Sequence, residues 1–177
     1  EMDDEDAADI VATLPRETAA RIIDEMEPDE AADLIGEMEP AEQEYVLRRL
    51  EDQAEVRPLL LHAEDSAGGL MTSEFLALGR RMTVAEALAA LRTWKPDAED
   101  IYDVYVVDRH SRLAGTISMR QLLIEEPAAE LADVVETDFV SVLVGTDQEE
   151  VARLMSRYDL ATLPVIDPQG MLVGVIT

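Results

Sequence analysis

Acidic side chains are the residues of this chain whose type and spacing could do chemistry. Asp29 and Asp33 stand four positions apart, so on a helix they would share one face. Two carboxylates placed this way repel each other, and a divalent cation between them and a second element would relieve that repulsion. The structural alternative is that Asp29 only complements the positive end of a helix dipole. The spacing alone leaves both interpretations open.

The charge of the whole chain favours cations over anions. Its 177 residues include 40 acids and 14 bases, which gives a net charge of −26. Such a chain repels phosphates and anionic lipid surfaces, so we expect no nucleic-acid partner. No apolar run approaches the length needed to cross a bilayer, so we expect no direct membrane insertion. Solubility or adaptation to high salt would explain the same charge without a bound ion.

Residues 1–64 repeat a short helical pattern. Pro15, Pro28 and Pro40 each precede a stretch that mixes acidic and apolar residues, and an earlier copy covers residues 5–11. Proline suits the first position of a helix, where its missing N–H would be unbonded anyway. Helices of about ten residues are unstable alone, but stacked copies bury a common core. We therefore predict an all-α superhelix of short helical repeats.

Residues 65–177 contain a duplicated unit. Two capping-box patterns, at 83–86 and 146–149, are expected to open helices. Short apolar strands follow each of them, as expected for a covered sheet. These expected strands cover residues 104–107, 113–118, 162–166 and 172–177. We predict an α+β fold in which the superhelix precedes two β-α-β-β-α units, over 65–125 and 126–177, with the second unit truncated at its C-terminus.

The two units resemble CBS domains, which occur in tandem pairs. The likeness rests on Val106-Val107-Asp108 with Leu113-Ala114-Gly115-Thr116-Ile117-Ser118, and on Val165-Ile166-Asp167 with Leu172-Val173-Gly174-Val175-Ile176-Thr177. CBS pairs serve many proteins, so they identify a fold rather than a function. The order of parts is more specific. A helical repeat, the linker Asp65-Ser66-Ala67-Gly68-Gly69-Leu70-Met71-Thr72 and a CBS pair together resemble the cytosolic region of MgtE-type magnesium channels and transporters.

This resemblance implies a Mg²⁺ sensor rather than an enzyme. It implies a homodimer formed through the CBS domains, on the cytoplasmic face of the membrane and attached to its own transmembrane domain. Ions bound between acidic faces of the helical and CBS domains would hold the pore closed. Mg²⁺ prefers oxygen ligands and keeps several waters, so a few carboxylates on separate elements would suffice. No Gly-rich phosphate loop or nucleophile–base pattern supports catalysis.

By the same resemblance, six residues match positions that the family uses for magnesium. They are Asp29, Asp33, Asp147, Glu149, Ser156 (through its carbonyl) and Asp159. Asp147 and Glu149 also have structural interpretations, because both stand at the start of an expected helix. Asp159 follows a helix end, where the dipole does not favour an acid, so it is the strongest single candidate.

Two further functions remain as alternatives. Many CBS pairs bind adenine nucleotides, and Arg120 and Gln121 would then meet phosphate and ribose, so ATP is a possible second ligand. Gln121 replaces the aspartate usual for the ribose, and Asp103 stands where nucleotide-binding relatives place a stacking aromatic residue. Both substitutions argue against ATP. The helical repeat could instead bind a protein partner in its concave groove.

Overall fold

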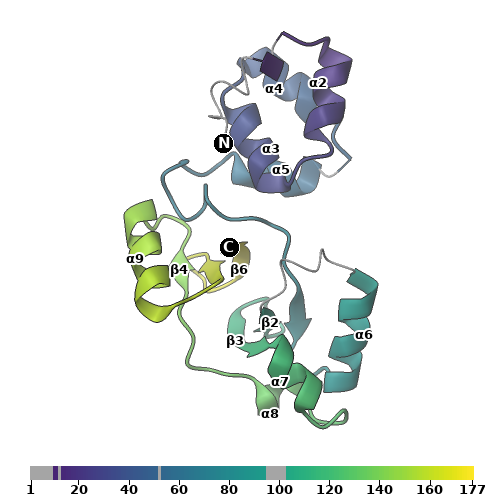
Figure 1. Cartoon of the computed structure of the whole chain (residues 1–177), viewed down its shortest axis with the longest axis vertical. Helices are drawn as coiled ribbons and strands as arrows, with labels where there is room; N and C mark the ends of the chain where they lie inside the picture. Colours follow the sequence, from purple (N-terminus) through teal and green to yellow (C-terminus); the bar gives the residue numbers. More distant parts are fainter. Residues whose placement is uncertain (1–9, 12, 52, 95–102) are drawn as a thin grey trace.

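The computed structural model describes residues 10–11, 13–51, 53–94 and 103–177. The N-terminal part consists of short helices, and the C-terminal part consists of two small mixed units (Figure 1). None of the described helices is both long and apolar enough to span a membrane.

The helical region confirms the repeat that the prolines predict. Its helices are α2 (Arg16–Ile23), α3 (Pro28–Gly36), α4 (Pro40–Leu47) and α5 (Gln53–Leu59). Pro28 and Pro40 occupy the first turn of α3 and α4, and Pro15 directly precedes α2. Each helix contributes apolar side chains such as Ile23 and Ile35 to a shared core. Most of the predicted earliest copy, at residues 5–11, lies outside the described residues.

Each of the two mixed units contains a three-stranded sheet. The first unit comprises β1 (Ala77–Gly79), α6 (Val84–Trp94), β2 (Asp103–Val107), β3 (Leu113–Ser118) and α7 (Met119–Ile124). The short helix α8 (Leu131–Val134) follows and packs in the core of this first unit. The second unit comprises β4 (Val142–Leu143), α9 (Gln148–Tyr158), β5 (Leu163–Ile166) and β6 (Leu172–Ile176).

The two sheets share one topology, which confirms the predicted duplication. In each unit the first strand runs parallel to the second, and the second runs antiparallel to the third. The irregularities match too: the register shifts at Val106/Val107 in one sheet and at Val165/Ile166 in the other. Asp108 and Asp167 then organise the two equivalent turns, because each carboxylate accepts two backbone N–H groups of its own turn.

The linker, residues 65–72, belongs structurally to the second unit although the first unit follows it in sequence. The Ala67 N–H donates to the Thr146 carbonyl at 2.7 Å, and the Gly68 N–H donates to the Val144 carbonyl at 2.8 Å. Thr72 then pairs with Val175 of β6. A single apolar cluster runs from the helical region through Ala67 and Met71 into the second unit. The linker therefore joins the helical region to the far half of the CBS-like pair.

The two mixed units meet through their equivalent turns. The Leu113 N–H donates to the Gly170 carbonyl, and the Leu172 N–H donates to the Ser111 carbonyl. Tyr105, Leu172 and Val175 form a small apolar cluster in which side chains of both units pack together. The duplicated sequence thus gives equivalent backbone contacts from each unit to the turn of the other.

Candidate functional site

Asp29 lies in the first turn of α3 and is partly buried. Its Oδ1 atom is shielded from solvent and has no hydrogen-bond partner in the described structure. A buried carboxylate oxygen without a partner is costly, and a bound cation is one way to satisfy it. The position of Asp29 at the start of a helix does not by itself explain this unpartnered oxygen.

Asp29 is one of three carboxylates of the helical region that act on Glu74. Glu27 precedes α3, Glu55 lies on α5, and Glu74 follows the linker on the way to β1. Partial burial raises the pKa of the Glu74 carboxyl, and charge repulsion from Glu27 and Glu55, a hydrogen bond with Glu27 and repulsion from Asp29 raise it further. We call these four residues the acidic junction. It brings like charges together where the helical region meets the segment that leads into the first unit.

Most of the acidic junction was not predicted from the sequence. Glu27, Glu55 and Glu74 come from three separate segments, and no spacing within the sequence links Glu74 to a helix of the repeat. The one available signal was that Glu74 follows the Gly-Gly linker closely, at the boundary between two differently patterned regions. Proximity between such segments is a property of the tertiary structure.

The other predicted magnesium residues are not among the four residues of the acidic junction. Asp33 is half-buried one turn along α3 from Asp29, as the spacing predicts. Asp147, Glu149, Ser156 and Asp159 are exposed and belong to the helix α9 or its two caps. No group of three or more Asp, Glu or His side chains within the described ranges is arranged to hold a metal ion. The structure therefore does not assemble the predicted set into one site.

The cap of α9 differs from the predicted capping box. Asp147, rather than Thr146, is the N-cap, and its Oδ1 accepts the Glu149 N–H at 2.9 Å. The Thr146 N–H donates instead to the Leu143 carbonyl, so Glu149 has no capping role there. The capping box predicted at 146–149 was wrong, because the linker pairs with residues 144–148 and the helix starts one residue later than predicted. The pattern at 83–86 does form a capping box.

Asp159 has a backbone role that the sequence did not indicate. It is the C-cap of α9 and adopts the left-handed conformation, with φ of 53° and ψ of 47°. Aspartate and asparagine tolerate this conformation better than most residues do. The helix dipole does not explain an acid at this position, but the backbone conformation does. Asp159 therefore has a structural explanation beside its predicted role as a metal ligand.

The residues predicted to contact a nucleotide are not all available for one. The Gln121 side-chain amide donates to the Val134 carbonyl at 3.0 Å, and its backbone N–H bonds the Ser118 hydroxyl that caps α7. Arg120 is exposed on the same helix. Asp103 is half-buried at the start of β2 and adds negative charge near the contact between the two units.

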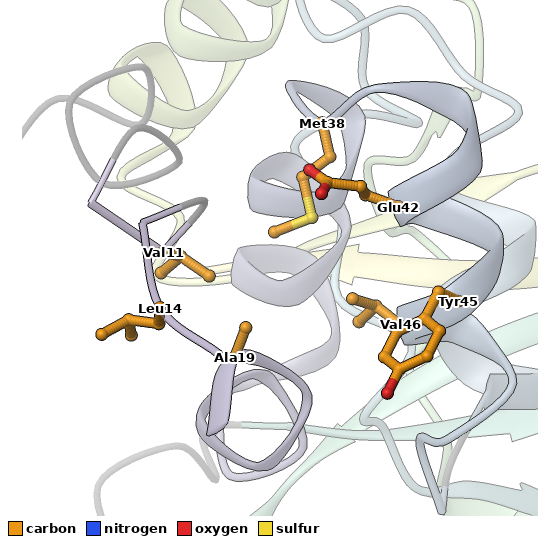
Figure 2. Close-up of a pocket in the computed structure, with 7 residues that line it drawn as sticks. All are labelled: Val11, Leu14, Ala19, Met38, Glu42, Tyr45 and Val46. Carbon is orange, nitrogen blue, oxygen red and sulfur yellow. The ribbon is translucent and has the colours of Figure 1, made fainter. Parts of the chain in front are cut away.

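The helical region also contains a small apolar pocket (Figure 2). The residues that line it are Val11, Leu14, Ala19, Met38, Glu42, Tyr45 and Val46. Glu42 supplies the single carboxylate of this lining. Such a lining offers no oxygen ligand set for a hard cation.

Family comparisons cover nearly the whole chain. The MgtE intracellular N domain matches residues 1–65, and the CBS domain matches residues 67–126 and 131–177. This chain belongs to the MgtE family. The magnesium transporter MgtE of Thermus thermophilus is 50% identical to it over 125 residues, which are 71% of the chain and 28% of that relative. The chain thus spans little more than a quarter of this full-length MgtE.

Solved structures agree with this MgtE assignment. The soluble part of a magnesium transporter superposes with a TM-score of 0.89 at 35% identity, covering 100% of the chain and 70% of that structure. The cytosolic domain of the Mg²⁺ channel MgtE in complex with ATP superposes with a TM-score of 0.83 at 39% identity, covering 99% of the chain and 77% of that structure. The predicted α+β architecture of helical region plus CBS pair is confirmed. These relatives are transport proteins rather than enzymes, which agrees with the prediction that the chain does not catalyse a reaction.

Proposed function

We propose that this chain is the Mg²⁺-sensing regulatory region of an MgtE-type magnesium channel or transporter, on the cytoplasmic face of the membrane. It would act as a homodimer formed through the CBS units and would regulate a membrane pore elsewhere in the full-length protein. The observation that carries this proposal is the acidic junction, where Glu74 faces Glu27, Asp29 and Glu55. An arrangement that gathers like charges between two parts of a chain favours a cation that neutralises them.

The mechanism is a population shift between a compact and an open arrangement. Repulsion within the acidic junction favours separation of the helical region from the CBS pair when Mg²⁺ is scarce. A Mg²⁺ ion with one ligand at Asp29 and further oxygens or waters from the junction would bind the compact form better and increase its population. Compaction would hold the pore closed, which gives feedback on uptake.

The experiment is small-angle X-ray scattering during a Mg²⁺ titration, with KCl added in a parallel series to the same ionic strength. The proposal expects the radius of gyration to fall with Mg²⁺ and to stay higher in matched KCl. Equal compaction in the two series would mean that the acids respond to bulk screening alone. In that case the sensing proposal is wrong.

Two variants locate the response at the junction. Glu74→Gln removes one repelling charge, so it should be more compact without Mg²⁺ and should change less on titration. Asp29→Asn keeps the shape of the side chain but removes the negative charge of the proposed ligand. This variant should shift the titration midpoint to a higher Mg²⁺ concentration. Asp138→Asn is the matched control, because Asp138 is exposed and the change removes the same charge. A control that behaves like either variant would place the effect in overall charge rather than in this junction.

The other acidic residues predicted to bind magnesium, one on α3 and three at α9, are tested in the same series. Asp33→Asn, Asp147→Asn, Glu149→Gln and Asp159→Asn each retain approximate side-chain shape while removing a charge. A shift of the midpoint with Asp159→Asn or Asp147→Asn would support bridging between the helical region and α9. Wild-type midpoints for all four would restrict the site to the junction around Asp29.

ATP binding is a second candidate, supported by the related MgtE cytosolic domain that was crystallised with ATP. Arg120 is the exposed cation that would meet phosphate. The charge at Asp103 and the occupied amide of Gln121 oppose it. Isothermal titration calorimetry with ATP decides the question: heat that disappears in Arg120→Ala would support the nucleotide site, and no heat at millimolar ATP would remove it.

A further inference from the structure

Asp103 forms a side-chain hydrogen bond that links the two CBS units. It is the first residue of β2, and its Oδ2 atom accepts from the Thr162 hydroxyl at 3.4 Å. Thr162 directly precedes β5 of the second unit and is 8% exposed. The pair is separated by 59 positions in sequence. Any change in the charge of Asp103 therefore acts directly on the contact between units.

Tyr105 provides the second polar group at this contact. It lies two residues after Asp103 on the same strand, so both side chains point to one face of the sheet. Tyr105 is only 3% exposed, and its hydroxyl has no hydrogen-bond partner in the described structure. Burial raises the pKa of Tyr105 to about 12, the Thr162 hydroxyl offsets part of that effect and the charge of Asp103 adds to it, so Tyr105 faces Asp103 as a neutral phenol.

The remaining surroundings of Asp103 do not compensate its charge. On β3 the residue opposite it is Ser118, and the segment paired with Thr116 contributes Glu136, which repels it. None of the ion pairs among the described residues includes Asp103. Burial is the main reason that its carboxyl has a raised pKa; the Thr162 hydroxyl offsets part of that effect and Glu136 adds to it.

We propose that Asp103 is a proton-binding site that tightens the contact between the two CBS units when it is neutral and loosens it when it is ionised. The protonated carboxyl removes a charge from a half-buried interface and adds a hydrogen-bond donor beside Thr162 and Tyr105. The ionised carboxylate loses part of its hydration and faces Glu136 without a cation. This proton site is independent of magnesium at the acidic junction.

The direction of the pH effect follows from linkage. A carboxyl whose pKa is raised by folding binds its proton more tightly in the folded chain than in the unfolded one. Its contribution to stability is complete below the usual value of 3.8 and is lost as the pH rises through the higher folded value. The CBS pair should therefore be tighter in mildly acidic solution than at neutral pH, to the extent that Asp103 controls it.

The test is thermal unfolding of the full chain between pH 4 and pH 8, followed by tryptophan fluorescence. Trp94, the single tryptophan, lies on α6 of the first unit and reports on the CBS pair. Asp103→Asn imitates the neutral carboxyl, and Asp138→Asn removes one charge at an exposed position. We expect the melting temperature of Asp103→Asn to exceed that of Asp138→Asn by about 2–4 °C at pH 8, with the difference vanishing near pH 4.

Thr162→Val provides a second, independent test. Because the Thr162 hydroxyl stabilises the ionised carboxylate, its removal should enlarge the effect of Asp103→Asn at pH 8. An unchanged effect would show that Thr162 is not the partner, which overturns the link between units. NMR titration of the Asp103 carboxyl carbon, assigned with the Asn variant, must give a folded pKa above 3.8. A value at or below 3.8, or equal melting curves for Asp103→Asn and Asp138→Asn, overturns the proposal.

Discussion

Gly174 of β6 lies directly against Met71 of the linker. A Cβ atom at Gly174 would overlap the Met71 side chain, which is 2% exposed and has little room to move. Gly174 therefore keeps the linker seated on the second unit. Because the linker also begins the path to Glu74, this contact helps to set the position of the acidic junction.

Gly174→Ala should destabilise the CBS pair by about 1–3 kcal/mol, because an added methyl group overpacks a filled interface. Gly145→Ala is the matched control, since nothing lies within 4 Å of a Cβ at that position. Urea unfolding followed by Trp94 fluorescence measures both. Equal midpoints for the two variants would show that the linker yields to the added group at little cost.

Asp159 offers a way to separate a backbone role from a metal role. Because its φ is positive, Asp159→Gly should leave stability nearly unchanged, whereas Asp159→Ala should cost about 1 kcal/mol. Both variants lack the carboxylate. If both shift the Mg²⁺ midpoint equally, Asp159 is a ligand. If neither does, the charge of Asp159 plays no part in Mg²⁺ sensing. Chemical unfolding and the scattering titration provide the two measurements.

Asp108 should stabilise the turn between β2 and β3 only while it is ionised. Backbone N–H groups of His110 and Arg112 donate to its carboxylate and hold its pKa below the usual value. The stabilisation is present above pH 3.8 and is lost as the pH falls through the lower folded value. Asp108→Ala should thus melt below wild type at pH 7, and the gap should close below pH 3.8.

The control for Asp108 is Asp138→Ala, which removes an exposed carboxylate at a position with no turn to organise. The melting curves in acid should be measured at low protein concentration. The isoelectric point of the chain is about 4.1, and a protein without net charge associates more readily. A gap between Asp108→Ala and wild type that stays constant from pH 7 to pH 3 would contradict the ionised turn.

The capping box of α6 should contribute measurably to the first unit. The Thr83 N–H donates to Glu86 Oε2 at 2.8 Å, and the Glu86 N–H donates to Thr83 Oγ1 at 3.3 Å. Thr83→Ala should cost about 1 kcal/mol in urea unfolding, since the Glu86 N–H loses its partner. Thr137→Ala, at an exposed position, is the comparison. Equal stability of the two variants would mean that water replaces the cap without loss.

Local patterns predicted the elements well, because they depend on neighbours in sequence. Pro28 and Pro40 start helices through their own backbone geometry, and the duplicated strands follow from short apolar runs with Asp108 or Asp167 at the turn. The failure at Thr146 has a tertiary cause. The linker pairs with residues next to it, and that pairing moved the cap to Asp147.

The sequence by itself determined the family, the helical repeat, the duplicated unit and the acidic character of the chain. It also placed Asp29 and Asp33 on one helix face, because that follows from the helical period. Only the tertiary structure decided that the linker packs on the second unit, that Glu74 meets Asp29 and that Asp103 faces Thr162. Those contacts join residues far apart in sequence. The burial of each carboxyl in the folded chain, and the charges placed near it, determine its pKa.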